Sequence, residues 1–402
     1  MADPPFLLHS SLLDLFLVFC VETQLLLRRL RNERDLALRG DNAMSTRVIL
    51  AGGGTAGHIE PALAVADALM KKNSGIECIF LGTESGLEQL LVPKAGYRLI
   101  CIPRVTLPRK FTLSIAVFPF ALIASIVGAF RALSGADVLI GFGGYVSAPA
   151  YLAAKMRGVP IVIHEANAKP GWANRLGRMF ARVVAVNFED LTDRWPASVL
   201  TGMPIRDSIT SLSRLSEREL REFATLHRTS WNFDDGRPVI AIFGGSQGSA
   251  HINSVVAEFL KNPLSRNFQI IHALGVNNPL PQAREGYLPM AYFHDMAAIY
   301  GSSDLLITRS GAVTCSEIMT VGRYAILVPL PHGNGEQVTN AQSLVRQGRA
   351  ISVANKDFTA HWLATNLEQA IRSAHSLGYS PSDMHRGAAA RIADLALAEV
   401  PS

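Results

Sequence analysis

The sequence predicts an α/β protein of two doubly wound, Rossmann-like domains, and three observations support this fold class. Short apolar runs alternate with longer helical stretches, which is the pattern of β–α–β units. A glycine-rich turn follows the first predicted strand of each half, at residues 52–57 and 244–248, and a helix begins directly after each turn. The chain has 402 residues, of which 49% are hydrophobic and 18% charged, so it can form two separate cores.

The strands are predicted where a short apolar run ends near glycine or a polar residue. In the first half they are residues 48–51, 78–81, 138–140, 161–163 and 183–186. In the second half they are residues 239–243, 269–273, 305–308 and 325–328. We place the domain boundary at 202/203, which gives a first domain of residues 44–202 and a second domain of residues 203–402 that includes the final helical segment.

Residues 1–43 differ from the rest of the chain. The stretch 6–21 is largely apolar, but Asp14 interrupts it and no basic segment precedes it, so it fits a secretory signal poorly. We interpret residues 1–43 as an accessory extension or an upstream start, with folded sequence beginning near Met44. A membrane-anchoring helix is the alternative.

Residues 111–130 contain no charged side chain, and length alone makes them a transmembrane candidate. A proline inside the stretch, and neighbours on both sides that belong to one predicted domain, argue against a membrane span. One interpretation is a buried helix. The other is an apolar patch that rests on an anionic membrane surface together with nearby basic residues, namely Arg104, Arg109, Lys110 and Arg131.

The charge and cysteine content exclude other classes. A net charge of +5 permits attraction to anionic phosphates or membrane surfaces but is too small to imply binding to nucleic acid. The four cysteines are scattered, without the paired spacing of a metal site or a disulfide framework. A reducing cytoplasm is therefore the expected compartment.

The first glycine turn offers backbone N–H groups and a helix N-terminus to a ligand. Gly52, Gly54 and Gly57 also satisfy the dinucleotide pattern G-x-G-x-x-G, and Glu84 ends the second strand, where a ribose-binding acid would sit. A nicotinamide oxidoreductase is therefore one alternative that this motif leaves open.

The second half of the sequence distinguishes better between these classes of enzyme. Two strand–glycine–helix junctions, at 244–249 and 309–317, can both present backbone donors to an anion, and Arg206 lies just ahead of this domain. A nucleotide diphosphate is the ligand that this pattern favours. Glu317 would lie about one turn into its helix, where it can accept hydrogen bonds from ribose hydroxyls or simply stabilise the helix N-terminus.

Six motifs together resemble the MurG-type N-acetylglucosaminyltransferases of peptidoglycan synthesis. They are GGTAGHIEPALAVA at 53–66, GFGGYVSAP at 141–149, HEAN at 164–167, GGSQG at 244–248, RSGAVTCSE at 309–317 and PLPHGNGEQVTNA at 329–341. The similarity covers nearly everything after Met44, in the family's order and spacing. Residues 1–43 have no counterpart in it.

The resemblance implies a GT-B fold, in which two Rossmann-like domains face a cleft, with no cofactor and no metal. It implies transfer of N-acetylglucosamine from UDP-N-acetylglucosamine to the 4-hydroxyl of the N-acetylmuramyl residue of lipid I. The product is lipid II, formed with inversion as a β-1,4 linkage. The implied partners are these two substrates and an anionic membrane surface, and the implied location is the cytoplasmic face of the bacterial membrane, as a peripheral protein.

The resemblance also assigns site residues. For the donor these are Thr55, Ala56, Gly57, Asn167, Arg206, Ser246, Phe293, Ala312, Val313, Thr314, Cys315, Ser316, Glu317 and Gln337. Among them, Phe293 falls where the family's backbone recognises uracil. For the acceptor they are Gly54, Tyr145 and Asn174. Packing over its glycine turn is an alternative role for Tyr145.

His58 is the residue best suited to be the catalytic base, because an imidazole that titrates near neutrality can take the proton of the attacking hydroxyl. A structural histidine bonded to its glycine turn is the alternative. His164 and Glu165 could equally orient or deprotonate the acceptor, and a carboxylate paired with the imidazole would raise its basicity.

Two departures from the family pattern are Ala56, where many members have glycine, and Met203, where asparagine is common. Neither removes a group able to do chemistry. Besides the oxidoreductase, two alternatives remain. One is a different UDP-sugar enzyme on the same fold, with another acceptor or with epimerase activity. The other is a non-catalytic scaffold for cell-wall assembly.

Overall fold

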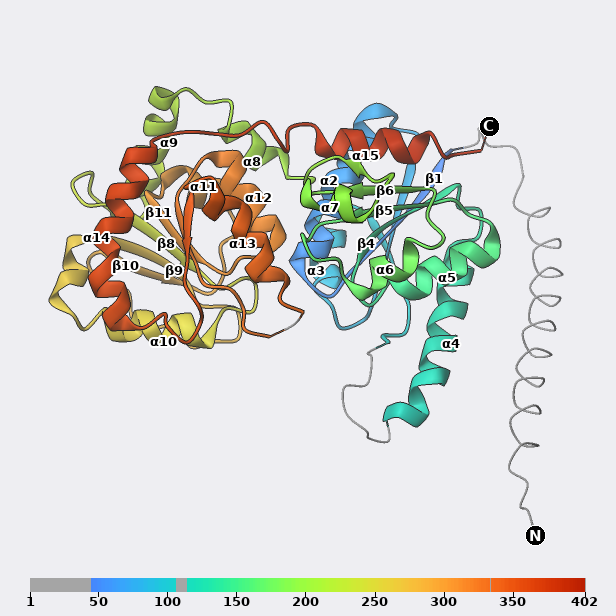
Figure 1. The fold of residues 1–402 in the computed structure, drawn as a ribbon, viewed down its shortest axis with the longest axis horizontal. Helices are drawn as coiled ribbons and strands as arrows, with labels where there is room; N and C mark the ends of the chain where they lie inside the picture. The colour runs from blue at the N-terminus through green and yellow to red at the C-terminus, as the bar shows by residue number, and fades with distance from the viewer. Residues whose placement is uncertain (1–44, 106–113, 333, 402) are drawn as a thin grey trace, which may run out of the picture. The chain divides into compact units, whose positions relative to one another are not determined.

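The computed structural model describes residues 45–105, 114–332 and 334–401. The predicted extension 1–43 and the basic residues Arg109 and Lys110 lie outside this part of the chain. Figure 1 shows two groups of strands, each covered by helices. Both groups are parallel sheets, as the alternation of apolar and helical segments predicts.

The first sheet has seven parallel strands in the order β3-β2-β1-β4-β5-β6-β7. Its strands are β1 (Arg47–Gly52), β2 (Glu77–Gly82), β3 (Arg98–Cys101), β4 (Val138–Gly143), β5 (Ile161–Glu165), β6 (Val183–Val186) and β7 (Val199–Leu200). Its helices are α2 (Ala56–Lys72), α3 (Glu88–Lys94), α4 (Ser114–Ala132), α5 (Ser147–Arg157), α6 (Trp172–Gly177) and α7 (Asp190–Arg194).

The second sheet has six parallel strands in the order β10-β9-β8-β11-β12-β13. Its strands are β8 (Val239–Phe243), β9 (Gln269–Ala273), β10 (Tyr287–Met290), β11 (Leu305–Thr308), β12 (Ala325–Leu327) and β13 (Ala350–Ser352). The helices after the first domain are α8 (Asp207–Leu212), α9 (Glu217–Ser230), α10 (Ala250–Phe259), the 3₁₀-helix η1 (Pro263–Asn267), α11 (Met296–Ser302), α12 (Ala312–Val321), α13 (Glu336–Arg346), α14 (Ala360–Leu377) and α15 (Ala388–Leu397).

Strand β8 shows how its sequence makes a sheet that is buried on both faces. Its side chains alternate between two cores: Val239, Ala241 and Phe243 face one, while Ile240 and Ile242 face the other. All five residues are buried, as a central parallel strand requires. A continuous apolar run with period-two alternation therefore predicts β8 correctly, and β6, β9 and β11 also have their predicted bounds.

Both sheets have the doubly wound strand order, in which the chain reverses direction beside the first strand. The reversal lies between β1 and β4 in the first sheet and between β8 and β11 in the second. Ligands of such sheets bind outside the carboxyl ends of the strands at this point. The predicted glycine turns at 52–57 and 244–248 follow β1 and β8, so the topology places both at these positions.

Helix α4 confirms a helix within the apolar stretch 111–130, and its described side chains lie in two environments. Ser125, Ala129 and Phe130 are buried, and the helix packs on α5. Phe120 is 74% exposed and Ile123 is 47% exposed. The helix is therefore partly buried and partly an exposed apolar stripe. Among the described residues, no helix is both long and apolar enough to span a membrane.

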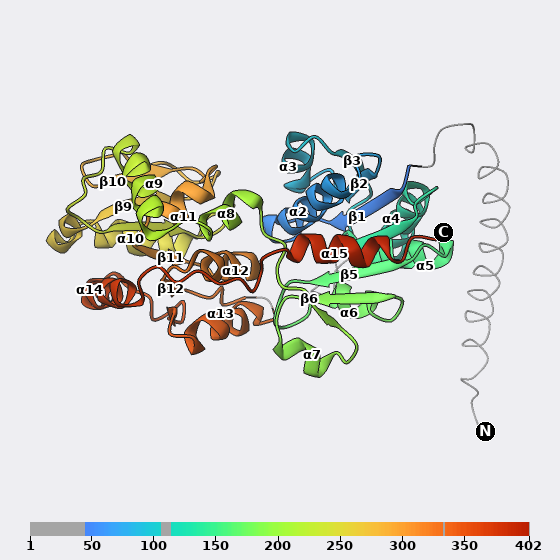
Figure 2. The same cartoon turned by 90° about the horizontal axis from the view of Figure 1, so that it is seen from above.

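The final helix α15 packs on the first domain. It contacts α2, β4 and β5, and its Ile392 and Ala396 belong to the same core as Val48 and Ile59. Figure 2 shows α15 among the elements of the first sheet. We expected residues 203–402 to form one domain and did not expect α15 to pack on the first domain. The boundary at 202/203 stays a prediction.

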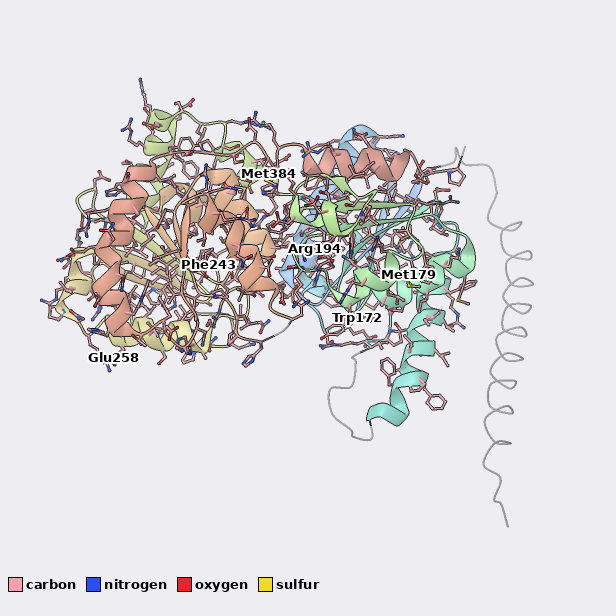
Figure 3. The ribbon with its side chains drawn as sticks, in the orientation of Figure 1. Trp172, Met179, Arg194, Phe243, Glu258 and Met384 are labelled. Atoms are coloured by element: carbon pink, nitrogen blue, oxygen red, sulfur yellow. The ribbon has the colours of Figure 1, made fainter. Side chains whose placement is uncertain are left out.

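The chain passes between the two sheets twice, and the two crossing segments touch. The backbone N–H of Met203 donates to His385 Nδ1 at 3.1 Å, and the guanidinium of Arg391 donates to the carbonyl of Thr201. Met384, in the returning segment, is labelled in Figure 3. Met203, one of the departures from the family pattern, is completely buried in the second domain's core.

Candidate active site

The turn after β1 places His58 in the third position of helix α2. Its Nδ1 lies 3.1 Å from Thr55 Oγ1, and Thr55 is the extended residue at which the helix begins. Burial lowers the pKa of His58 below its ordinary value, while a hydrogen bond with the Gly53 carbonyl and the charge of Glu88 act to raise it. The imidazole is therefore neutral at pH 7, as a general base must be.

The turn after β4 lies against this histidine. Gly143 and Gly144 have φ values of +90° and +85°, which residues with a side chain rarely adopt. A Cβ on Gly143 would lie 3.5 Å from His58 Nε2, and one on Gly144 would lie 2.6 Å from the Gly53 carbonyl oxygen. Glycine at both positions lets the two turns at the first reversal point meet.

Glu88 is a site residue that sequence reasoning missed. This carboxylate is completely buried beside the first turn, where it accepts the N–H of Gly54 at 2.9 Å. It also accepts the N–H of Thr83 at 2.8 Å and the Thr83 hydroxyl at 2.9 Å. A signal in the sequence is the nearby glycine pair at 82 and 86, but only the fold shows which carboxylate these glycines surround.

Gly54 and Tyr145, two of the predicted acceptor residues, line one small cavity. Arg104 also lines it and lies over the Tyr145 ring, 5.6 Å from the ring centre. The rest of the lining is Gly53, Thr83, Ser85, Gly86 and Val146. Tyr145 therefore faces a cavity and contacts Arg104, and its packing over the glycine turn stays a prediction.

Asn174, the third predicted acceptor residue, is buried and its amide is fully engaged. The amide nitrogen donates to the His164 carbonyl and to Glu165 Oε2, and the amide oxygen accepts the Tyr151 hydroxyl at 2.7 Å. These bonds hold the loop between β5 and α6 in place. Both hydrogen-bond directions of its amide are thus used inside the protein.

His164 and Glu165 are buried as well, and the structure does not pair them with each other. His164 lies 3.1 Å from the Gly202 carbonyl, and burial lowers its pKa to about 4. Glu165 accepts hydrogen bonds from Asn167 and Asn174 and from the N–H of Gly171, while burial raises its pKa. A deprotonating role has no geometric support for either residue, because neither carries an exposed basic atom. Their bonds instead hold the loop that carries Asn167.

In the second domain, the turn 244–248 joins β8 to α10. Ser246 is half-buried within it, and Ser249 caps the helix by accepting the N–H of Ile252. Arg309, at the end of β11, donates to Ser249 Oγ at 2.7 Å and to the carbonyls of Val328 and Pro329. A buried guanidinium therefore ties the turns after β8, β11 and β12 together.

Helix α12 contains the predicted residues from Ala312 to Glu317. Glu317 is buried and accepts hydrogen bonds from Arg206 at 3.1 Å and from the Tyr300 hydroxyl at 2.8 Å. Its carboxylate thus does more than stabilise the helix N-terminus. Burial raises the pKa of Cys315 to about 12, so this thiol stays protonated and is no nucleophile.

The side chains around Cys315 have different surroundings. Ala312 is buried, Val313 and Thr314 are half-buried, and Ser316 accepts a hydrogen bond from Asn187 of the first domain. Val313 and Thr314 are therefore the more accessible predicted residues of this helix turn.

Arg206 joins the helices that carry His58 and Glu317. Its guanidinium lies 3.4 Å from Glu60 Oε1 on α2 and 3.1 Å from Glu317 Oε1 on α12. Arg206 Nε is buried without a hydrogen-bond partner in the structure. This single cation therefore links helix α2, which carries the predicted base, to the predicted ribose-binding carboxylate on α12.

Asn167 and Gln337 meet through a residue that the sequence did not single out. Asn340 Nδ2 donates to Asn167 Oδ1 at 3.2 Å and to the Ser310 carbonyl, and Asn340 Oδ1 accepts the N–H of Ala168. The Ser310 hydroxyl donates to the Gln337 carbonyl, and Gln337 Oε1 accepts the N–H of Leu330. Within the described residues, the Gln337 amide nitrogen donates no hydrogen bond.

Phe293 is buried at the edge of the second domain's core. Its ring packs edge-on against Phe243, with 5.9 Å between the ring centres. Figure 3 labels Phe243 inside this domain. Because the side chain packs inward, only the backbone of Phe293 can take the recognition role implied by the family. Within the described residues, no group of three or more His, Cys, Asp or Glu side chains could hold a metal ion.

Two family models match the chain, one for each domain. The model of the glycosyltransferase family 28 N-terminal domain matches residues 48–186, and the model of the family 28 C-terminal domain matches residues 239–396. The matched ranges follow the two parallel sheets. The GT-B fold class expected from the resemblance is confirmed, and the oxidoreductase alternative is excluded as a description of the family.

Curated relatives narrow the family. The chain is 44% identical to the UDP-N-acetylglucosamine–N-acetylmuramyl-(pentapeptide) pyrophosphoryl-undecaprenol N-acetylglucosamine transferase of Corynebacterium diphtheriae, over 78% of this chain and 84% of the relative. It is 43% identical to the protein of the same name in Streptomyces coelicolor, over 82% and 90%.

A solved structure agrees with these relatives. The crystal structure of Acinetobacter baumannii MurG matches with a TM-score of 0.63 and 27% identity, covering 88% of this chain and 99% of that one. Sequence motifs, domain models, relatives and fold all point to one group. The chain belongs to the MurG-type N-acetylglucosamine transferases of glycosyltransferase family 28.

Proposed function

We propose that this enzyme transfers N-acetylglucosamine from UDP-N-acetylglucosamine to the 4-hydroxyl of the N-acetylmuramyl residue of lipid I. The product is lipid II, with a β-1,4 linkage formed by inversion. The observation that carries this proposal is Arg206, which contacts a carboxylate on the helix of His58 and a carboxylate on the nucleotide helix α12. Arg206 thereby ties the helix that carries the proposed base to the helix that carries the proposed donor site.

The second domain supplies the groups for the donor diphosphate. The N-termini of α10 and α12 point partial positive charge and backbone N–H groups outward, and Ser246 and Arg206 add polar donors. Charge that develops on the departing UDP is met by these fixed dipoles, so the reaction needs no metal. Glu317 takes the ribose hydroxyls, and Gln337 contacts the sugar.

In the first domain, His58 accepts the proton of the acceptor hydroxyl. With a proton on Nδ1, which faces Thr55 Oγ1, the lone pair of Nε2 is the basic site. The acceptor oxygen forms its bond to the anomeric carbon from the face opposite the diphosphate. The bond to the diphosphate breaks and UDP leaves with its electrons, which gives inversion.

We further propose that the enzyme works at the cytoplasmic face of the membrane, where its lipid-linked acceptor would lie. The exposed stripe of Phe120, Ile123 and Val127 on α4, with Arg131 at the end of that helix, suits an anionic membrane surface. Trp172 and Met179, labelled in Figure 3, are also exposed on this domain.

One experiment with two arms tests both proposals. Purified protein is incubated with radiolabelled UDP-N-acetylglucosamine and either a water-soluble lipid I analogue or lipid I in anionic vesicles, in excess chelator. We expect transfer in both arms, and Phe120→Asp should slow transfer only in the vesicle arm, on the order of tenfold.

Three results would contradict these proposals. Absence of transfer to either acceptor rejects the acceptor assignment and favours another UDP-sugar reaction. A strict requirement for metal rejects the mechanism. Equal rates for Phe120→Asp and wild type on vesicles reject the membrane surface.

A further inference from the structure

Glu88 is a buried carboxylate that is held by hydrogen bonds. It is the first residue of α3, it is completely buried, and none of the ion pairs found in the described residues involves it. An unpaired charge in an apolar interior is costly unless hydrogen bonds compensate it. The three donors from Gly54 and Thr83 supply that compensation.

Three glycines, two from the end of β2 and the β2–α3 connection and one from the turn after β1, leave the space that this side chain fills. A Cβ on Gly86 would lie 1.9 Å from Glu88 Oε2, one on Gly82 would lie 2.5 Å from its Cγ, and one on Gly53 would lie 2.9 Å from Oε1. No side chain fits at any of these positions without displacing the carboxylate. The local sequence is therefore arranged around Glu88 as much as around the backbone turn.

The Glu88 carboxylate affects His58, the predicted base, in two ways. Its bond to the Gly54 N–H fixes the turn whose Gly53 carbonyl and Thr55 hydroxyl contact His58. Its charge also interacts directly with the imidazole and favours the protonated ring. The other titratable or charged groups near it are Cys101 on β3, Glu84 after β2 and, around the adjoining cavity, Arg104 and Tyr145.

We propose that Glu88 is a positioning residue of the transfer reaction: it holds the first glycine turn in place and stabilises the imidazolium that His58 becomes. This proposal rests on the proposed function, in which His58 Nε2 takes the hydroxyl proton while the glycosidic bond forms and UDP leaves. Glu88 gains and loses no proton in that step. It makes the proton's arrival on His58 more favourable.

The variant Glu88→Gln removes the charge with almost no change of shape. The pKa of His58, followed by NMR of carbon-13-labelled histidine rings, should fall by on the order of half a pH unit. Because only the neutral ring is a base, the acid limb of the pH profile of kcat/KM should move to lower pH in the same direction. At the pH optimum, kcat should drop by about two- to threefold, because half a unit in the pKa of a base changes its rate by no more than about threefold.

Thr83→Val is the matched control. It removes one hydrogen bond to the same carboxylate but keeps the charge, so the NMR pKa of His58 should stay at the wild-type value. In a His58→Ala background, Glu88→Gln should cause no further loss of kcat, because Glu88 acts through His58. If Glu88→Gln does not fold, Glu88→Asp keeps the charge and should leave the pKa of His58 near the wild-type value.

Three results would overturn the proposal: an unchanged pKa of His58 in Glu88→Gln, a full further loss of kcat in the double variant, or a pKa in Glu88→Asp lowered by half a unit or more. The NMR titration needs no substrate. If wild type transfers no sugar to lipid I, the proposed function fails while the titration still decides whether Glu88 supports the imidazolium.

Discussion

The turn after β1 and the turn after β8 share a backbone pattern, but the side chains behind them carry opposite charges. Behind the first, the buried carboxylate of Glu88 accepts the Gly54 N–H. Behind the second, the buried guanidinium of Arg309 donates to Ser249 and to the carbonyls of Val328 and Pro329. Both turns lie at the reversal point of a doubly wound sheet.

The opposite charges of these buried side chains distinguish two functions of a glycine turn. A buried anion favours a group that becomes positive, such as an imidazole that accepts a proton, and it disfavours a second anion. A buried cation beside free helix N-termini favours a diphosphate. The glycines set the path of the backbone, while the buried partner selects the charge of the ligand.

The largest effect in this comparison is expected for the histidine that follows the first turn. His58→Ala should lower kcat on the order of 10²-fold or more, because the transfer then lacks its base. Steady-state kinetics with a lipid I analogue measures this loss. A decrease of tenfold or less, in a variant that folds normally, would leave His58 with only a structural role.

His251 is the matched control, since it follows the second turn in the same way. Its Nε2 lies 2.9 Å from the Phe358 carbonyl on the protein's interior side. His251→Ala should therefore keep the wild-type kcat while it loses about 1 kcal/mol of stability with that hydrogen bond. A comparable loss of kcat in both variants would erase the distinction between the two turns.

A smaller effect is expected from adding one methyl group at each site. Gly144 has φ +85°, and a Cβ there would lie 2.6 Å from the Gly53 carbonyl oxygen, whereas Gly245 has φ +91° with nothing within 4 Å of an added Cβ. Gly245→Ala should cost about 1 kcal/mol of unfolding free energy from backbone strain alone. Gly144→Ala should cost about 2 kcal/mol or more, because the clash adds to the strain.

Urea denaturation of the two glycine variants measures both costs. Equal losses of stability would show that the first turn yields to the added methyl group. The turn would then be less tightly held by its buried carboxylate than the contacts of Gly53 and Gly54 imply.

The smallest expected effect concerns the guanidinium behind the second turn. Arg309→Lys keeps the charge but loses the planar fork that reaches Ser249 and the strand-end carbonyls, so the Kd for UDP should rise about threefold. Isothermal titration calorimetry measures this change. Arg349→Lys is the control, because within the described residues the fork of Arg349 donates only to Ser380, and its Kd for UDP should match wild type. An unchanged Kd in Arg309→Lys would mean that the charge alone suffices.

The sequence predicts the centre of each sheet better than its edges. Strands β6, β8, β9 and β11 have their predicted bounds because buried parallel strands are continuous apolar runs. The edge strands β3, β7, β10 and β13 were missed. Strand β7 has only two residues, both exposed, and β3 mixes exposed and half-buried positions, so neither shows a hydrophobic pattern.

The sequence also predicts some residues of the candidate site better than others. Glycine turns and helix starts depend on local sequence, so the surroundings of His58, Ser246 and Ala312 could be predicted. Glu88 and Asn340 could not, because the bond of Glu88 to Gly54 and the bonds of Asn340 to Asn167 and Ala168 join segments that are distant in the chain. His164 and Asn174 have side chains suited to chemistry, and only the fold shows that burial and internal hydrogen bonds occupy them.

The return of α15 to the first domain has a consequence for how the protein is made. Its Ile392 and Ala396 complete the core that α2 forms with β1, although the strands of that sheet end at Leu200. Because the ribosome synthesises the chain from its N-terminus, the core of the first domain stays incomplete while the whole second sheet is being made. The first domain is therefore synthesised first but its core is completed last, and its α2 face stays uncovered until α15 has been made.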